Sequence, residues 1–161
     1  MLITAPEEET LPEYSEKRVF LAGTIDNGDS EDWQATIAGL ITRPNVKIFN
    51  PRRSGWNSDA SSMDVSQQII WEQKYMNKAT DVFFNILPKS TSMITLLELG
   101  QMCERKRVAS RDQQKQCVVC CPREYMRFDN VFTMCAINGI PLITEFDLAV
   151  QYLNIRLNLK F

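Results

Sequence analysis

The sequence has 161 residues and not one histidine. Serine–histidine and cysteine–histidine nucleophilic pairs are therefore excluded, because each needs an imidazole as its base. The groups left for acid and base chemistry are carboxylates, tyrosine, lysine and cysteine. Any catalytic site in this chain has to be built from these side chains.

The sequence also lacks an apolar run of the roughly 20 residues that a membrane-spanning helix needs. Its first residues, MLITAPEEETLPEYSEKR, show no basic start, apolar stretch or small-residue cleavage site of a secretory signal. We therefore expect a cytoplasmic protein with no membrane role. The acidic, proline-containing character of residues 1–17 predicts a mobile arm, and residues 18–161 are then expected to form one domain.

The sequence also has no excess of basic residues. The chain has 18 lysines and arginines against 20 aspartates and glutamates, with a net charge of −2 and a pI near 5.3. Nucleic-acid binding depends on basic side chains that neutralise phosphates, so a nucleic-acid partner is not expected. The charge balance does not exclude a small-molecule ligand.

Cysteines are present in an odd number, five, and three of them lie in the apolar stretch CVVCCP, at Cys117, Cys120 and Cys121. The Cys117-x-x-Cys120 spacing is compatible with metal or redox chemistry. However, no second cysteine pair with ligand spacing exists, and histidine is absent. We expect buried reduced thiols and no metal site, with a metal or a disulfide as the alternative.

Short β-rich apolar runs alternate with amphipathic stretches along the chain. Strands are expected at Arg18–Ala22, Val46–Phe49, Asp81–Leu87, Cys117–Cys121 and Ile140–Ile143. Helices are expected at Ser30–Thr42, Asp64–Ala79, Met93–Val108 and Glu145–Asn154, with a helix or irregular segment around Asn130–Asn138. This alternation predicts right-handed crossovers and a single doubly wound α/β domain with a parallel sheet of about five strands.

The ligand crevice of a doubly wound sheet lies outside the carboxyl ends of its strands, where the strand order reverses. Four connections reach this edge, at residues 23–28, 50–63, 88–98 and 122–130. The first contains Gly23, Thr24 and Ile25 in the turn AGTIDNG, where glycine lets a ligand approach the backbone. The turn has neither a G-x-G-x-x-G fingerprint nor a phosphate-binding loop, so an ordinary strand-to-helix turn is the alternative.

Two glutamates are candidates for chemistry. Glu98, in LLELG, stands near the start of a helix, whose dipole would favour the ionised carboxylate that a nucleophile needs. Alternatively, Thr95 and Glu98 match a capping box. Glu72, in QIIWEQ, lies on the preceding helix, and two carboxylates from different elements form the pair that glycosyl chemistry uses. A solvated helix glutamate is the alternative for Glu72, and a core position is the alternative for Trp71 beside it.

Polar and aromatic side chains in two of the connections are candidate ligand contacts. Arg52 and Arg53 offer cations for a phosphate or a sugar, and Trp56 offers a flat face for a stacked base. An ordinary solvated loop is the alternative. Asn130 offers an amide to sugar hydroxyls, or else caps a helix.

Several motifs occur together in one order. They are VFLAGTID…W at Val19–Trp33, NPRR…W at Asn50–Trp56, QIIWE at Gln68–Glu72, the strand ATDVFF, LLELG at Leu96–Gly100 and YMRFDNV at Tyr125–Val131. In content and order they resemble the nucleoside 2-deoxyribosyltransferase-like family, over about residues 19–143. Each motif alone is weak, and their combination is specific.

The resemblance implies a flavodoxin-like domain of nucleotide salvage that moves 2-deoxyribose from a deoxynucleoside to a free nucleobase, without a cofactor. It implies that Glu98 attacks the anomeric carbon and forms a covalent glycosyl-glutamate, and that Glu72 contacts the leaving base. It places Asn130 at the sugar of a neighbouring subunit's site, hence a homo-oligomer. Ser92 stands where some members carry an aspartate that contacts the sugar. The substrate contacts then expected are Gly23, Thr24, Ile25, Asn50, Arg52, Arg53, Trp56, Trp71, Ser92 and Asn130.

Two other functions stay open. One is hydrolysis of a nucleoside or nucleotide N-glycosidic bond, with Arg52 and Arg53 holding a 5′-phosphate. The other is a catalytically silent nucleotide-binding module.

Overall fold

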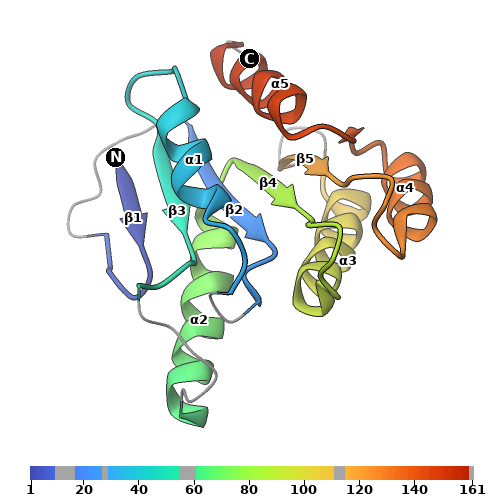
Figure 1. Cartoon of the computed structure of the whole chain (residues 1–161). Helices are drawn as coiled ribbons and strands as arrows, with labels where there is room; N and C mark the ends of the chain where they lie inside the picture. Colours follow the sequence, from blue (N-terminus) through green and yellow to red (C-terminus); the bar gives the residue numbers. More distant parts are fainter. Residues whose placement is uncertain (10–16, 27–28, 55–60, 111–114, 160–161) are drawn as a thin grey trace.

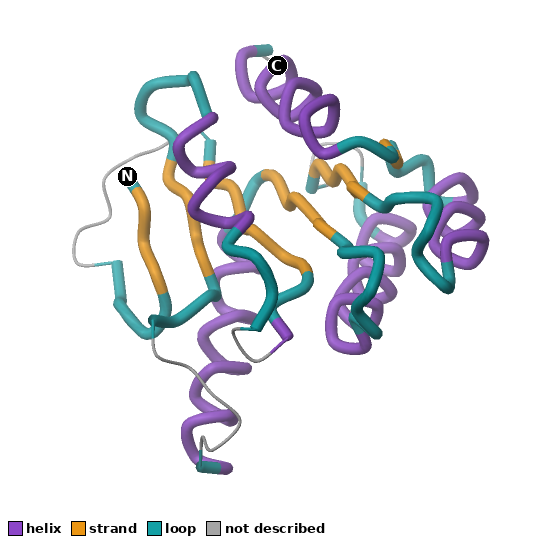
Figure 2. Tube along the Cα trace, in the orientation of Figure 1, coloured by secondary structure: helices purple, strands orange, loops and turns teal. Residues whose placement is uncertain are grey.

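In the computed structural model, the protein is built around a parallel sheet with helices on both faces (Figures 1 and 2). The structure describes residues 1–9, 17–26, 29–54, 61–110 and 115–159. Its strands are β1 (Leu2–Thr4), β2 (Arg18–Gly23), β3 (Lys47–Asn50), β4 (Asp81–Asn85), β5 (Gln116–Cys120) and β6 (Leu142–Ile143). Its helices are α1 (Trp33–Leu40), α2 (Ser62–Lys78), α3 (Met93–Val108), α4 (Phe128–Ile137) and α5 (Phe146–Asn158). The doubly wound α/β fold predicted from the alternation is confirmed.

The strand order is β1-β3-β2-β4-β5-β6, and all neighbours are parallel. The chain leaves β2 toward β3 on one side and returns to place β4 on the other side of β2. The order therefore reverses between β2 and β4, whose last paired residues are Gly23 and Asn85. A crevice is expected at this point, beyond the carboxyl ends of the two strands.

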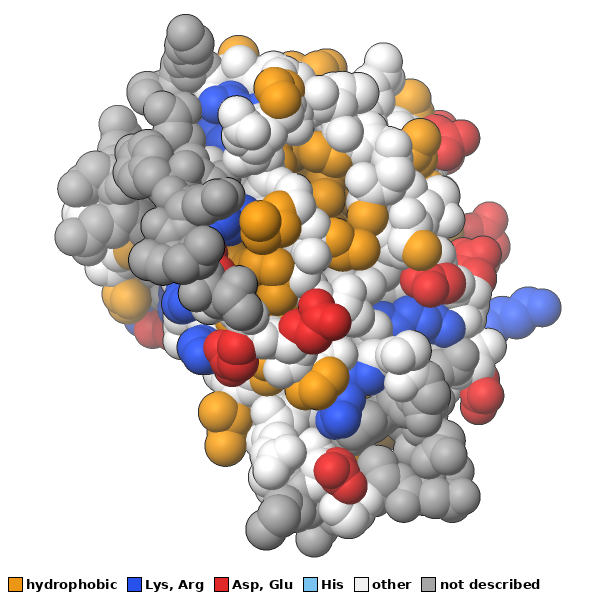
Figure 3. All heavy atoms as spheres, turned by 90° about the vertical axis from the view of Figure 1, so that its left-hand side faces the viewer, with side chains coloured by type: hydrophobic (Ala, Val, Ile, Leu, Met, Phe, Trp, Pro, Cys, Tyr) orange, Lys and Arg blue, Asp and Glu red, His pale blue; other side chains and the backbone are white. Residues whose placement is uncertain are grey.

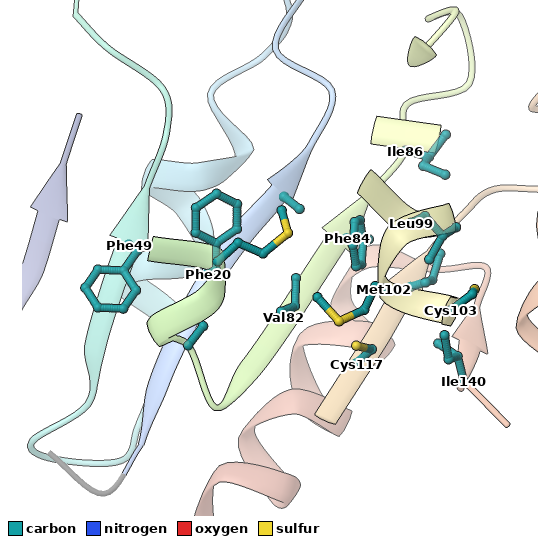
Figure 4. Close-up of a cluster of buried hydrophobic side chains, with 14 of the residues drawn as sticks. Phe20, Phe49, Val82, Phe84, Ile86, Leu99, Met102, Cys103, Cys117 and Ile140 are labelled. Atoms are coloured by element: carbon teal, nitrogen blue, oxygen red, sulfur yellow. The ribbon is translucent and has the colours of Figure 1, made fainter. Parts of the chain in front are cut away.

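Each face of the sheet has its own apolar core. Helices α2, α3 and α4 cover one face, where Tyr75 and Met102 are fully buried, and α1 and α5 cover the other, where Ile37 and Leu153 are buried. Figure 4 shows the first of these cores, where Phe84 of β4 and Cys117 of β5 lie beside Met102 of α3. Burying each large apolar side chain stabilises the fold by about 1.5–3 kcal/mol, which explains why central strands tolerate few polar residues.

The N-terminal segment departs from the expectation of a mobile arm. Residues 2–4 form β1, which pairs with β3, so the sheet has a sixth strand among the described residues. The Glu7 carbonyl accepts a hydrogen bond from Trp71 Nε1 (2.8 Å), and Glu9 N donates to the Tyr75 hydroxyl (2.8 Å). Two acidic side chains of this segment also form ion pairs with lysines: Glu8 with Lys74, and Glu9 with Lys47. Residues 1–9 are therefore docked on the domain, and residues 10–16 lie outside the described part of the chain.

All five cysteines are buried and none is in a disulfide. Cys117 packs in the core under α3, whereas Cys120 packs in the core under α1 and α5. Residues three apart in a strand point to opposite faces, so this pair cannot hold one metal ion. Burial raises the pKa of both thiols to about 12, which disfavours the thiolate that metal binding requires.

Neither the helices nor the face next to β1 (Figure 3) indicates a membrane-spanning segment or a patch of one charge in the part of the chain that is described. Within the described ranges, no helix combines the length and apolarity required to cross a bilayer. On the face next to β1, basic and acidic side chains are interspersed over the part drawn in colour (Figure 3).

Candidate active site

A cavity of about 370 Å³ opens at the reversal of strand order, between the end of β2 and helices α2 and α3. Its wall brings together side chains from parts of the sequence that are far apart. Of the residues predicted from the sequence, it contains Gly23, Thr24, Ile25, Arg53, Glu72, Ser92 and Glu98. Both candidate carboxylates therefore face one cavity.

The turn after β2 forms one wall of the cavity and is held by the neighbouring strand. Gly23 has φ +149°, and a Cβ at this position would lie 2.3 Å from the Asn85 carbonyl oxygen. Thr24 N donates to that same oxygen (2.9 Å), and Trp33 Nε1 donates to the Thr24 carbonyl (2.8 Å). Glycine is thus required by the close packing of β2 against β4, which differs from the expected role of admitting a ligand to the backbone.

Ser92 connects this turn to the helix that carries Glu98. It has φ +48° and precedes α3 without capping it through its side chain. Its Oγ instead lies 2.7 Å from Thr24 Oγ1, which also accepts a hydrogen bond from Leu87 N (3.1 Å). These buried contacts fix the start of α3 relative to β2, and hence the direction in which Glu98 points.

Glu98 is 7% exposed and lies in the second turn of α3. The capping-box alternative does not hold, because the helix begins at Met93, so neither Thr95 nor Glu98 stands at a capping position. The carboxylate makes no hydrogen bond to any described residue. It is therefore a buried acid aimed at a cavity, without a structural partner.

Burial, with a smaller contribution from the neighbouring carboxylate of Glu72, raises the pKa of Glu98 from 4.5 to about 8. The sequence instead favoured a low pKa from the helix dipole. A helix start stabilises a nearby carboxylate by about 0.3–1 kcal/mol, which lowers a pKa by less than about one unit. Desolvation therefore outweighs the dipole, and Glu98 holds a proton at neutral pH.

Glu72 is held by a residue that the sequence reasoning missed. Gln68 Nε2 donates to Glu72 Oε1 (2.8 Å) and to the Pro51 carbonyl (2.7 Å), so it ties α2 to the connection after β3. Burial raises the pKa of Glu72, and the bond from Gln68 partly offsets this. The four-residue spacing of Gln68 and Glu72 on one helix was the available signal.

Asp26 is a second residue that the sequence reasoning did not single out. It lines the cavity, has φ +46°, and its carboxylate accepts a hydrogen bond from Ser90 Oγ (2.7 Å). Aspartate tolerates this left-handed conformation better than most residues, so its place in a tight turn was the available signal.

Two predicted substrate contacts have structural roles instead. Trp71 is 4% exposed and packs against the rings of Phe20 and Tyr75, with its indole N–H bound to the Glu7 carbonyl, so the core alternative holds. The Asn50 side chain accepts a hydrogen bond from Arg52 N (2.9 Å), which shapes the turn after β3. Neither lines the cavity.

Arg52 and Asn130 also lie apart from the cavity wall. The guanidinium of Arg52 donates to the carbonyls of Ser30 (2.7 Å) and Glu31 (3.1 Å), so it fastens the entry to α1. Asn130 lies exposed in the first turn of α4, where Arg127 is the N-cap residue, so Asn130 does not cap the helix. Trp56 falls outside the described residues.

A doubly wound parallel sheet, with the buried Glu98 and the half-buried Glu72 in a cavity at its reversal point, defines a flavodoxin-like α/β protein. The family model described as "Nucleoside 2-deoxyribosyltransferase like" matches residues 16–125, more than half of the chain. The chain belongs to this family. The matched residues include both Glu72 and Glu98 and end before α4. No curated protein matches the chain.

The raised pKa of Glu98 has a measurable effect on stability. The unfolded chain releases this proton near pH 4.5, whereas the folded protein holds it up to about pH 8. Its contribution is therefore fully present below pH 4.5 and is lost as the pH rises toward 8. Glu98→Gln cannot ionise, so we expect it to exceed the wild type in free energy of unfolding by about 3 kcal/mol at high pH, less than the full desolvation penalty because water relaxes around the ionised group.

Urea unfolding of both proteins at mildly acidic and mildly basic pH measures this difference. Glu104→Gln is the matched control, because Glu104 is exposed on the same helix and its pKa is lowered by Arg107. If Glu98→Gln raised the free energy of unfolding by the same amount at both pH values, Glu98 would have an ordinary pKa in the folded protein.

Proposed function

We propose that this protein transfers 2-deoxyribose between nucleobases through a covalent intermediate on Glu98. The observation that carries the proposal is a pair of carboxylates, the buried Glu98 from α3 and the half-buried Glu72 from α2, facing one cavity at the reversal of strand order. Family membership supplies the substrate class, a deoxynucleoside and a free nucleobase.

The reaction requires the proton of this pair to move, because Glu98, whose pKa is raised to about 8, is the protonated carboxylate at neutral pH. Two close carboxylates share one proton over the pH range between their two ionisations. In the reactive arrangement Glu72 holds that proton and Glu98 is ionised. Glu98 then bonds to the anomeric carbon while the bond to the base nitrogen breaks, and Glu72 delivers its proton to the leaving base.

A second base completes the cycle. It attacks the anomeric carbon, returns its proton to Glu72 and releases Glu98 as a carboxylate. Two inversions at this carbon retain the configuration of the sugar. A 2-deoxy sugar lacks the electron-withdrawing hydroxyl, so the positive charge that develops in each transition state costs less, and two carboxylates suffice.

The sugar end of the site is assigned to Asp26. Ser92 and Asp26 both line the cavity, but the Ser92 hydroxyl contacts Thr24, whereas the Asp26 carboxylate, which accepts a hydrogen bond from Ser90, can accept further ones from sugar hydroxyls. A 5′-phosphate is disfavoured beside this carboxylate, and Arg52 is engaged with Ser30 and Glu31. We therefore favour an unphosphorylated deoxynucleoside.

Hydrolysis of a nucleotide remains a second candidate, because Arg53 does line the cavity and would meet a phosphate. Incubation with deoxyinosine and adenine, followed by chromatography, separates the candidates. We expect deoxyadenosine and hypoxanthine. Free deoxyribose would indicate a hydrolase, cleavage of only the 5′-monophosphate would indicate a nucleotide substrate, and unchanged substrates would indicate a silent binding module.

A second copy of the chain is expected to cover the mouth of the cavity. Ile69, Met93 and Ile94 line the cavity and yet are 51%, 72% and 64% exposed. Large apolar side chains that cluster on a surface mark an interface, and Asn130 would then come from the neighbouring subunit. Sedimentation equilibrium is expected to give a multiple of the 18.6 kDa chain mass, and a monomer at every concentration would refute the shared site.

A further inference from the structure

A second cavity, of about 470 Å³, lies on the other face of the sheet, beyond the carboxyl ends of β4 and β5 and between α1 and α5. Figure 1 shows these two helices separated from α2 and α3 by the sheet. Aromatic rings surround the cavity floor. Phe83 lies beneath it, with its ring centroid 6.0 Å from that of Trp33 and 6.3 Å from that of Phe146, and the last two line the cavity.

The polar group at the floor is the side chain of Asn85. It is 2% exposed, and it lies on the same sheet face as Phe83 because the two residues are two apart in β4. Its Nδ2 is buried and has no hydrogen-bond partner in the described part of the chain. Leaving a buried amide donor unpaired costs about 1–3 kcal/mol, so such a group in a cavity wall indicates a missing acceptor.

The rest of the lining restricts the chemistry of that acceptor. Leu87, Pro88 and Pro122 add apolar surface, and Glu31 and Asp32 stand at the rim. No lysine or arginine lines the cavity among the residues that the structure places. An anion is therefore disfavoured, and a neutral flat ring fits both the aromatic walls and the volume, which lies in the range of small-molecule sites.

We propose that this cavity is a second ligand site, which binds a neutral planar ring through a carbonyl oxygen that accepts a hydrogen bond from Asn85 Nδ2. The site is separate from the cavity of Glu98, since the two lie on opposite faces and have no lining residue in common, although Thr24 of that cavity is hydrogen-bonded to Asn85, Trp33 and Leu87 of this one. The proposal does not rest on the proposed function.

Trp33 provides the reporter for this site, because its indole N–H is fixed to the Thr24 carbonyl and its ring lines the cavity. We would titrate ¹⁵N-labelled protein with benzamide, a neutral ring with one carbonyl, and follow the indole signal that Trp33→Phe removes. A saturable shift is expected by about 10 mM, with the Trp71 signal unmoved because that ring lies in the opposite core. Benzoate, the matched anion, is expected to bind at least about tenfold more weakly.

Three variants make the result specific. Asn85→Leu removes the donor and is expected to weaken benzamide about tenfold. Thr36→Trp fills the cavity from the exposed face of α1 without changing a core residue, and is expected to abolish the shift. Glu98→Gln, in the other cavity, should leave the affinity unchanged. The absence of a saturable Trp33 shift, or a shift that Thr36→Trp leaves intact, would overturn the proposal.

Discussion

Glu98→Ala is expected to reduce the rate of deoxynucleoside cleavage by a factor of about 10⁴ or more while the protein stays folded. The reason is that no other described carboxylate occupies its place in the cavity, and the chain has no histidine to substitute for it. Folding is preserved because the Glu98 carboxylate has no hydrogen-bond partner among the described residues that its removal would leave unpaired, and because an ionised acid at this buried position is itself destabilising.

Chromatographic assay of base release measures this loss, and circular dichroism checks the fold. Glu104→Ala is the matched control, since the Glu104 side chain is exposed on the same helix and pairs with Arg107, which is itself exposed. The control is expected to retain full activity. Residual activity above about one per cent in Glu98→Ala would remove this residue from the mechanism.

Gly23→Ala is expected to lower the free energy of unfolding by about 4 kcal/mol, the largest effect on stability that we predict. The added methyl would lie 2.3 Å from the Asn85 carbonyl oxygen and 2.8 Å from both the Asn85 nitrogen and the Trp33 ring. Two of these neighbours are backbone atoms of a central strand and cannot rotate away. The φ of +149° adds strain for any residue with a Cβ.

Urea unfolding of Gly23→Ala and Gly39→Ala makes the comparison. Gly39 lies in α1, and a Cβ there would meet nothing within 4 Å, so alanine should stabilise the helix by up to about 1 kcal/mol. If Gly23→Ala lowered the free energy of unfolding by less than about 1 kcal/mol, the close packing of β2 against β4 would not be what requires glycine at this position.

The sequence determined the architecture because burying a sheet on both faces requires apolar residues in a pattern that is visible within each short segment of the sequence. A strand such as β4 needs an unbroken apolar run, and a helix such as α5 needs one apolar stripe, so both were predicted to within a few residues. β1 was missed because three residues carry no periodicity and because its pairing depends on the free edge of β3.

The sequence also located the two glutamates, through motifs that occur in a fixed order. What it could not give was the environment of each side chain. The pKa of Glu98 depends on burial and on Glu72, which comes from another helix, and the position of Glu72 depends on Gln68 and Pro51. Desolvation is a property of every atom packed around a group, and most of those atoms are distant in the sequence.

The same reason explains why Trp71, Asn50 and Arg52 were expected to contact the ligand and do not line the cavity. Residue type and distance along the chain place a side chain near the carboxyl edge of the sheet, and that much followed from the sequence alone. Whether the side chain then turns to the cavity, to the core or to a backbone carbonyl is decided by which partner lies within hydrogen-bond distance. Only the tertiary structure brings those partners together.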